Sequence, residues 1–307
     1  MSAWREAAAA LAGRLEGLPP DGPPPHDLKF ELRLAAGAAE HALPRPAAGR
    51  PVYEPPAGEV LYDPDADLLF LELGPRLRAL CAPGRGRATV SALDPGPEEL
   101  WLLSHPLFTL PLAELAKRRG LFPVHAGGVA RGGRALLLAG ASGSGKSTLA
   151  LALLRSGLDF LGDDTLFLTR GAAGLRLHAF PDEVDLTDAT VAFFPELHPL
   201  LAAPLPAGWR KRRLRAERFY GAAVAWECAP AVLVLPRVVP GSESRLAPID
   251  PGEALVELVA NVLLTDPVSS QAHLDALAEL AAASRCYRLE TGSDLDGAVR
   301  RLRPLLD

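Results

Sequence analysis

Short runs of apolar residues, separated by polar and turn-forming residues, dominate the first third of the chain and predict strands. Four such runs span residues 28–34, 59–62, 68–73 and 88–93. Ahead of them, residues 2–18 place apolar side chains at helical spacing, and the proline-rich residues 19–26 form a linker. We therefore expect residues 1–98 to form an N-terminal helix and a β-rich lobe.

From residue 99 the pattern changes to strands that alternate with helices. Helices are expected at 98–119, 146–156, 251–264, 269–284 and 294–306, and strands at 123–130, 134–139, 160–161, 166–168, 175–180, 231–235 and 286–289. Arg131-Gly132-Gly133 suits a tight hairpin turn between the first two of these strands. Alternation of this kind is typical of an α/β sheet, so we expect residues 99–307 to form a second, α/β domain.

The composition fits a globular protein and argues against several classes of partner. The chain has 307 residues and 49% are hydrophobic, which is ample for a buried core. Its formal net charge of −5 disfavours a nucleic-acid partner, because such proteins neutralise phosphates with excess Lys and Arg. No apolar run approaches the ~20 residues that span a bilayer, so we expect no membrane partner.

Cysteine usage and the N-terminal pattern favour a cytoplasmic location. Cys81, Cys228 and Cys286 are far apart in the sequence and form no C-x-x-C pair. Buried, reduced thiols are expected rather than a disulfide framework or a zinc site. The N-terminus shows no basic region followed by an apolar stretch, so no secretory signal is expected.

The expected strand at 134–139 runs directly into a glycine-rich loop, which we define as residues 140–147. It reads Gly140-Ala141-Ser142-Gly143-Ser144-Gly145-Lys146-Ser147, the pattern G-x-x-x-x-G-K-S of phosphate-cradling loops. Glycines let successive N–H groups point at phosphate oxygens, and the following helix offers its positive end to the same anion. We expect residues 140–147, together with Thr148, to bind ATP.

Two side chains of this loop have specific expected roles. Lys146 supplies a compact positive charge for the β- and γ-phosphates, and Ser147 supplies a hydroxyl for Mg²⁺. Lys146 is one of only four lysines among 32 basic residues, so an arginine-rich chain has lysine where a point charge is wanted. The plain alternative is a glycine-rich turn before an ordinary helix.

Adjacent carboxylates follow the expected strand at 160–161. Phosphoryl transfer needs a carboxylate near Mg²⁺, and a hydroxyl acceptor also needs a base. Because the side chains of Asp163 and Asp164 point to different sides, the two could divide these tasks; the alternative is a turn or a helix cap. His125, on the strand before the glycine-rich loop, fits a catalytic and a structural role equally well.

These segments together resemble a known family. Val124-His125-Ala126-Gly127-Gly128-Val129, the glycine-rich loop and Leu161-Gly162-Asp163-Asp164 resemble the catalytic domain of HPr kinase/phosphorylase in order and spacing. More specifically, the chain looks like the HPr-kinase-related proteins of modified-peptide gene clusters, some of which phosphorylate a serine of a lasso-peptide precursor. The strong match covers about residues 120–168.

The resemblance implies a fold, a reaction and roles for individual residues. It implies an α/β kinase core of the HPr kinase/phosphoenolpyruvate carboxykinase type over residues 99–307, and a homo-oligomer. Asp163 would be the general base, and Asp164 the carboxylate on the metal side. His125 would lie near the transferred phosphate, while Lys146 would hold the phosphates and Ser147 would ligate Mg²⁺.

The chain also departs from that family. HPr kinases carry a glutamate-valine-arginine-glycine signature after the aspartate pair, whereas this chain has Glu183-Val184-Asp185 with no arginine after the valine. Glu183 is the candidate for the further metal carboxylate. The departure removes the basis for expecting the reverse, phosphorylase activity or HPr itself as the substrate.

The basic run Arg210-Lys211-Arg212-Arg213 has three interpretations. It is a solvated loop, a mobile loop whose arginine stabilises transition-state charge, or a docking site for an acidic peptide. For the whole chain, the leading expectation is an ATP- and Mg²⁺-dependent kinase that phosphorylates a hydroxyl, usually a serine, of a peptide or small protein. A small-metabolite kinase and a non-catalytic ATP-binding scaffold or sensor are the alternatives.

Overall fold

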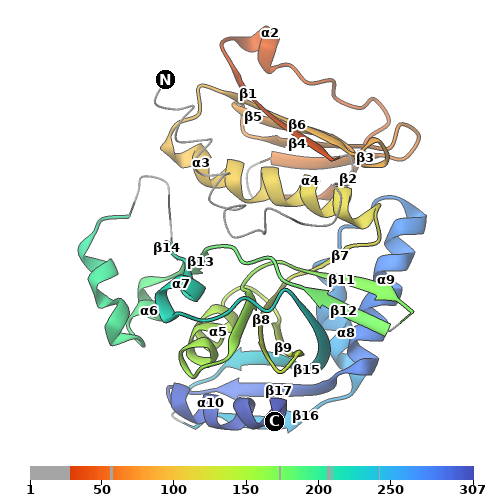
Figure 1. The fold of residues 1–307 in the computed structure, drawn as a ribbon. Coiled ribbons are helices and arrows are strands. Elements are labelled where there is room, and N and C mark those ends of the chain that lie inside the picture. The colour runs from red at the N-terminus through yellow and green to blue at the C-terminus, as the bar shows by residue number, and fades with distance from the viewer. Residues whose placement is uncertain (1–27, 56–57, 173, 206–208, 210, 242) are drawn as a thin grey trace. The chain divides into compact units, whose positions relative to one another are not determined.

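The computed structural model describes residues 28–55, 58–172, 174–205, 209, 211–241 and 243–307 (Figure 1). The helix expected at 2–18 and the linker at 19–26 lie outside these residues. The chain divides into two compact units. The first runs to Leu121 and includes residues 206–209 and 263–272, and the second contains the rest. The boundary between the two units lies after Leu121, whereas we expected it between residues 98 and 99. The reason is that the helices between these two positions pack on the first sheet.

The first unit is built on a six-stranded sheet in the order β1-β6-β5-β4-β3-β2. Its strands are β1 (Lys29–Ala35), β2 (Arg50–Tyr53), β3 (Gly58–Asp63), β4 (Leu68–Leu73), β5 (Leu77–Ala82) and β6 (Arg87–Leu93). β1 and β6 are parallel, and all other pairs are antiparallel. The four predicted strands are confirmed as β1, β3, β4 and β6; β2 and β5 were not predicted.

Helices complete this unit. They are α2 (Ala38–His41), the 3-10 turn η1 (Pro83–Arg85), α3 (Pro97–Ser104) and α4 (Pro106–Lys117). The single helix expected at 98–119 is two helices that meet at His105. The reason is Pro106, whose ring disfavours helical geometry at the residue before it. α4 packs on β5 and β6 and buries Leu107 and Leu115 against the sheet.

A buried polar cluster joins α4 to residues 263–272. The Lys117 Nζ donates to Glu114 Oε1 at 2.6 Å, to the Leu263 carbonyl at 2.9 Å and to Thr265 Oγ1 at 2.9 Å. The Thr265 hydroxyl in turn donates to Glu114 Oε2 at 2.6 Å. Lys117 and Glu114 are both buried, so these bonds compensate two charges that are removed from water.

The second unit holds a nine-stranded sheet with the path β10-β8-β9-β15-β12-β11-β7, in which β17 also pairs with β15, and β16 with β17. The strands are β7 (Phe122–Val124), β8 (Ala126–Arg131), β9 (Arg134–Ala139), β10 (Asp159–Gly162), β11 (Leu166–Gly171), β12 (Gly174–His178), β15 (Glu227–Val238), β16 (Arg245–Pro248) and β17 (Arg285–Thr291). β13 (Val184–Leu186) and β14 (Arg212–Leu214) form a separate two-stranded sheet.

Strand direction brings several strand ends to one edge. β15 is parallel to both β9 and β17. β10 is antiparallel to β8, and β8 is antiparallel to β9, so β10 runs in the same direction as β9. The carboxyl ends of β10, β9, β15 and β17 therefore lie at the same edge, which is where α/β sheets bind their ligands.

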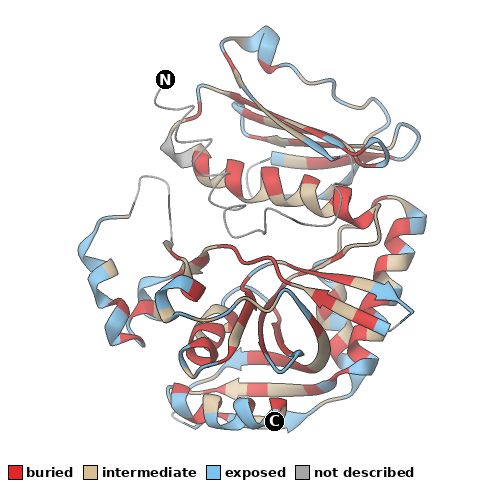
Figure 2. Ribbon diagram, in the orientation of Figure 1, coloured by how far each residue is buried: buried red, intermediate tan, exposed pale blue. Residues whose placement is uncertain are grey.

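The helices of the second unit pack its core around α5 (Lys146–Arg155). The others are α6 (Asp188–Val191), η2 (Pro195–Ala202), α7 (Ala216–Tyr220), α8 (Pro251–Val259), α10 (Leu295–Leu302) and η3 (Arg303–Leu306), while α9 (Pro267–Ala283) begins in the first unit's residues. α5 buries Leu149 and Leu153 against the sheet, and Figure 2 shows α5, β8 and β9 mostly in the colour of buried residues. The three cysteines are free and buried, as predicted.

Glycines allow β8 to lie very close to the chain around β10. A Cβ on Gly128 would lie 2.8 Å from Leu166 Cδ1 and 3.1 Å from Leu161 Cβ. A Cβ on Gly162 would lie 2.9 Å from the Phe180 carbonyl oxygen. No side chain fits at either position without displacing its neighbours, so the close approach requires glycine.

We expect Gly128→Ala to lower the free energy of unfolding by about 1–3 kcal/mol, because the added methyl overpacks this contact. Denaturant unfolding of the full chain measures it. The matched control is Gly171→Ala in β11, where an added Cβ meets nothing closer than 4.0 Å. Equal stability of the two variants would contradict the requirement for glycine at 128.

Candidate active site

The glycine-rich loop connects β9 to α5 in the conformation that its glycines permit. Gly140, Gly143 and Gly145 have φ angles of 140°, 82° and 100°. L side chains rarely adopt these angles, which explains the three glycines in physical terms. α5 begins at Lys146, immediately after the last of them. The loop thus ends at a helix N-terminus whose first N–H groups have no partner within the helix.

Lys146 lies folded onto its own loop. Its Nζ donates to the carbonyl oxygens of Gly140 at 2.8 Å and Ala141 at 3.1 Å. Burial lowers the pKa of the Lys146 ammonium, while Asp164 and Asp163 oppose that shift. The Ser144 hydroxyl, also in the loop, is buried without a hydrogen-bond partner among the described residues. An anion in the loop would accept hydrogen bonds from both groups.

Asp163 follows β10 and is buried at the edge where β9 also ends. Burial raises its pKa to about 7, against a hydrogen bond with Ser147 that lowers it. Asp164 and Asp185 raise it further, and Lys146 lowers it. The Oδ1 atom of Asp163 is buried and has no hydrogen-bond partner among the described residues. Asp163 is therefore a carboxyl group poised to exchange a proton near neutral pH.

His125 and Asp164 form a pair beside Asp163. The His125 Nδ1 lies 3.1 Å from the Asp164 carbonyl oxygen and 3.2 Å from its Oδ1. Because both neighbours are acceptors, Nδ1 is the nitrogen that carries the hydrogen. The two residues come from β-strand ends that are 39 positions apart in sequence. The structure thus brings His125, Asp163, Asp164 and Ser147 close to one another.

Glu183 and Asp185 face a common arginine. The Arg213 Nη1 lies 3.0 Å from Glu183 Oε2, and its Nε lies 3.9 Å from Asp185 Oδ1. The pairing of Asp185 with Arg213 between β13 and β14 sets this arrangement. Glu183 is thus engaged in an ion pair, while Asp185 acts electrostatically on Asp163.

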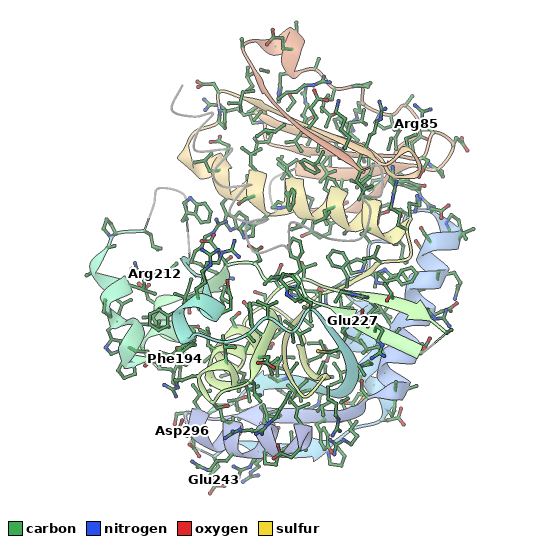
Figure 3. All side chains as sticks on the ribbon, in the orientation of Figure 1. Arg85, Phe194, Arg212, Glu227, Glu243 and Asp296 are labelled. Atoms are coloured by element: carbon green, nitrogen blue, oxygen red, sulfur yellow. The ribbon has the colours of Figure 1, made fainter. Side chains whose placement is uncertain are left out.

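The basic run is largely ordered by contacts within the second unit. Arg210 lies outside the described residues, and Lys211 is exposed. Arg212, which is labelled in Figure 3, donates to the Asp188 carboxylate at 2.8 Å and to the carbonyl oxygens of Leu200 and Ala203. Because Arg213 contacts Glu183 and Asp185 and β14 pairs with β13, this part of the basic run is a paired strand and not a free cationic loop.

Thr148 has a hydrogen-bond partner outside the glycine-rich loop. Its hydroxyl lies 3.1 Å from the Thr190 hydroxyl, which also contacts Thr187 Oγ1 at 3.0 Å. Thr187 caps α6 by accepting from the Thr190 N–H. Thr148 therefore anchors the start of α5 to α6.

Sequence reasoning missed Asp185 and Arg213. The spacing Glu183-x-Asp185 places two acidic side chains on one face of a strand, and this period-two pattern could have drawn attention to Asp185. Arg213 was treated only as a member of a basic run. Its contacts depend on the pairing of β13 with β14, which no local sequence pattern predicts.

The donors near the glycine-rich loop limit how a Mg²⁺ ion could be held. Among the described residues, no group of three or more His, Cys, Asp or Glu side chains is arranged to hold a metal ion. Mg²⁺ in nucleotide sites is commonly held by one or two carboxylates, waters and phosphate oxygens rather than by a cage of protein ligands. Ser147, with its hydroxyl on Asp163, and the neighbouring Asp164 fit that smaller donor set.

Comparisons with known proteins give likenesses to solved structures only. No family model and no curated protein matches the chain. A solved structure of the Hpr(Ser) kinase/phosphatase from Coxiella burnetii is similar at 13% identity, over 60% of this chain and 96% of that one, with a TM-score of 0.32. The chain is a mixed α/β protein. No helix in the described residues is long and apolar enough to cross a membrane.

The raised pKa of Asp163 predicts how stability depends on pH. The folded state holds this proton up to about pH 7, whereas an unfolded aspartate loses it near its ordinary value of 3.8. The stabilising contribution is therefore complete below about pH 4 and is lost as the pH rises to about 7. We expect Asp163→Asn to raise Tm by about 4–8 °C at pH 8 and to change it little at pH 4.5.

Thermal unfolding at the two pH values, without nucleotide, measures this difference. The control is Asp296→Asn, an exposed aspartate on α10 (Figure 3). A Tm shift of equal size at both pH values would show that Asp163 does not titrate in this range.

Proposed function

We propose that this protein is an ATP- and Mg²⁺-dependent kinase that transfers the γ-phosphate to a hydroxyl, preferably a serine of a peptide or small protein. The observation that carries the proposal is Asp163. It is a buried carboxyl with a pKa of about 7 and an unpartnered Oδ1, hydrogen-bonded to Ser147 at the end of the glycine-rich loop. A loop that only holds a nucleotide needs no such group.

Phosphate binding is assigned to the glycine-rich loop. The loop's backbone N–H groups, the start of α5 and the Ser144 hydroxyl provide donors, and Lys146 provides charge. Lys146 must exchange its two carbonyl acceptors for phosphate oxygens, which are stronger acceptors because they are charged. The glycines keep the loop backbone open to a ligand in the space that side chains would otherwise occupy.

Asp163 is assigned as the general base. A carboxylate whose pKa lies near neutrality is half deprotonated at cellular pH and still accepts a proton effectively. In the transfer step the acceptor's O–H proton passes to Asp163, the acceptor oxygen bonds to the γ-phosphorus, and the bond to the β–γ bridging oxygen breaks. Bound Mg²⁺ would supply positive charge to the phosphates during this step.

Ser147 and Asp164 are assigned to hold the metal, with His125 as a positioning residue. The Nδ1–H of His125 restrains both the carbonyl and the carboxylate of Asp164, which fixes the direction of that side chain. Glu183 is a weaker metal candidate than Asp164 because its carboxylate is paired with Arg213. Arg213 keeps the acidic pair Glu183 and Asp185 from opposing a bound polyphosphate.

The preference for a peptide acceptor over a small metabolite rests only on the sequence resemblance to HPr-kinase-related proteins. A non-catalytic nucleotide-binding scaffold is the second candidate function. The engagement of Glu183 with Arg213 favours it, because that pairing removes one carboxylate from the set that HPr kinases use. The two candidates differ in what they require of Asp163.

We expect Asp163→Asn to lower phosphoryl transfer by about 10²–10⁴-fold while it leaves the affinity for MgATP within about threefold. We expect Lys146→Ala to weaken MgATP binding itself. Transfer is followed with γ-labelled ATP, Mg²⁺ and a pool of serine-containing peptides and hydroxyl metabolites, and binding by calorimetry.

Asp296→Asn is the matched control and should behave as the parent protein. If the parent binds MgATP but no label reaches any acceptor, the scaffold is supported and the kinase is not. If Asp163→Asn transfers label as fast as the parent, Asp163 is not the base.

A further inference from the structure

The proposed reaction leaves open where the nucleobase lies. We propose that the base of the bound nucleotide packs on Val238, at the carboxyl end of β15, on the side of the glycine-rich loop opposite Asp163. This inference rests on the proposed function only in requiring that a nucleotide occupies the loop. It assigns Val238 a role that no sequence motif suggested.

The order of strands gives the bound nucleotide a direction. The sheet runs β10-β8-β9-β15, with β17 on β15, and the glycine-rich loop follows β9 (Figure 1). Asp163 follows β10 on one side of the loop. β15 and β17 end on the other side, at Val238 and Thr291. A γ-phosphate placed toward Asp163 directs the remainder of the nucleotide toward the ends of β15 and β17.

Val238 is exposed at the end of a strand whose middle is buried. Residues 232–236 of β15 are all buried, whereas the Val238 side chain is 61% exposed. Its Cγ2 lies 3.5 Å from the position that a Cβ on Gly145 would occupy, so Val238 lies beside the last glycine of the loop. An exposed apolar side chain beside an expected phosphate site offers the face of a base an apolar surface on which to pack.

The backbone around Val238 is held in place. The Val239 N–H donates to the Thr291 carbonyl, and the Ser293 N–H donates to the Gly241 carbonyl, both at 3.0 Å. The Ser244 hydroxyl donates to the Asp294 carbonyl at 3.1 Å. These bonds connect the chain after β15 to the chain after β17, so the surface at Val238 exists before a ligand arrives.

An aliphatic surface interacts with the face of a base and not with its edge. The gain comes from removing apolar area from water, and it is of similar size for adenine and guanine. Because polyphosphate without a base cannot make this contact, ATP and inorganic tripolyphosphate should respond differently to changes at Val238. That difference separates base binding from phosphate binding.

The test compares Val238→Asn with the parent chain in calorimetric titrations with MgATP and with Mg-tripolyphosphate. We expect the affinity for ATP to fall about 3–10-fold and the affinity for tripolyphosphate to stay within about twofold. Val238→Leu, which keeps an apolar surface, should restore ATP binding to near the parent value. Val256→Asn is the control, since Val256 on α8 is 72% exposed and remote in sequence from the loop.

Val238→Trp provides an independent signal. We expect the added tryptophan's fluorescence to be quenched by ATP and not by tripolyphosphate, whereas Val256→Trp should respond to neither. Unchanged ATP affinity in Val238→Asn, or equal losses for both ligands, would overturn the inference while the proposed kinase stands. Failure of the parent protein to bind either ligand would overturn the proposed function instead.

Discussion

The candidate site depends on how closely β8 approaches the chain that carries Asp163. Gly127 and Gly128 place bare backbone against that segment, and a Cβ on Gly127 would lie 3.5 Å from Asp163 Oδ1. This proximity excludes water from one side of the carboxyl and raises its pKa. The same approach brings His125, which precedes β8, to the adjacent Asp164. The close packing of β8 and the raised pKa of Asp163 therefore both depend on the absence of side chains at Gly127 and Gly128.

The charged groups around Asp163 shift its pKa in opposite directions. Asp164 and Asp185 disfavour its ionised form, and Lys146 favours it. Arg213 neutralises the outer acidic residues Glu183 and Asp185 through the β13–β14 pair. A polyphosphate and its metal would change this balance at its centre, where the groups are buried and solvent screens them least. Binding of a polyphosphate and its metal would therefore rearrange the charged side chains around Asp163 locally.

Local patterns predicted the elements whose cause is local. Strand β4 is an apolar run interrupted only by Glu72, β6 alternates polar and apolar residues, and the turn of Gly132 and Gly133 needs the positive φ angles that both residues have. β2 and β5 escaped prediction because one contains Pro51 and the other alternates small residues such as Ala79 and Cys81 with larger ones. Their strand character comes from pairing with neighbours. Likewise, motif spacing indicated His125 and Asp163, but the positions of Asp185, Arg213 and Val238 near the candidate site follow only from how the strands pair.

The buried cluster of Lys117, Glu114 and Thr265 has a consequence for how the protein is made. Lys117 and Glu114 are synthesised well before Thr265, and until that residue emerges from the ribosome two charged side chains lack a hydroxyl partner and a carbonyl acceptor. The first unit is thus completed only when residues 263–272 have been made, although most of it is translated much earlier. N-terminal domains usually fold early during synthesis. Here the unit that contains the N-terminal sheet cannot complete its buried polar cluster until part of the C-terminal third of the chain is made.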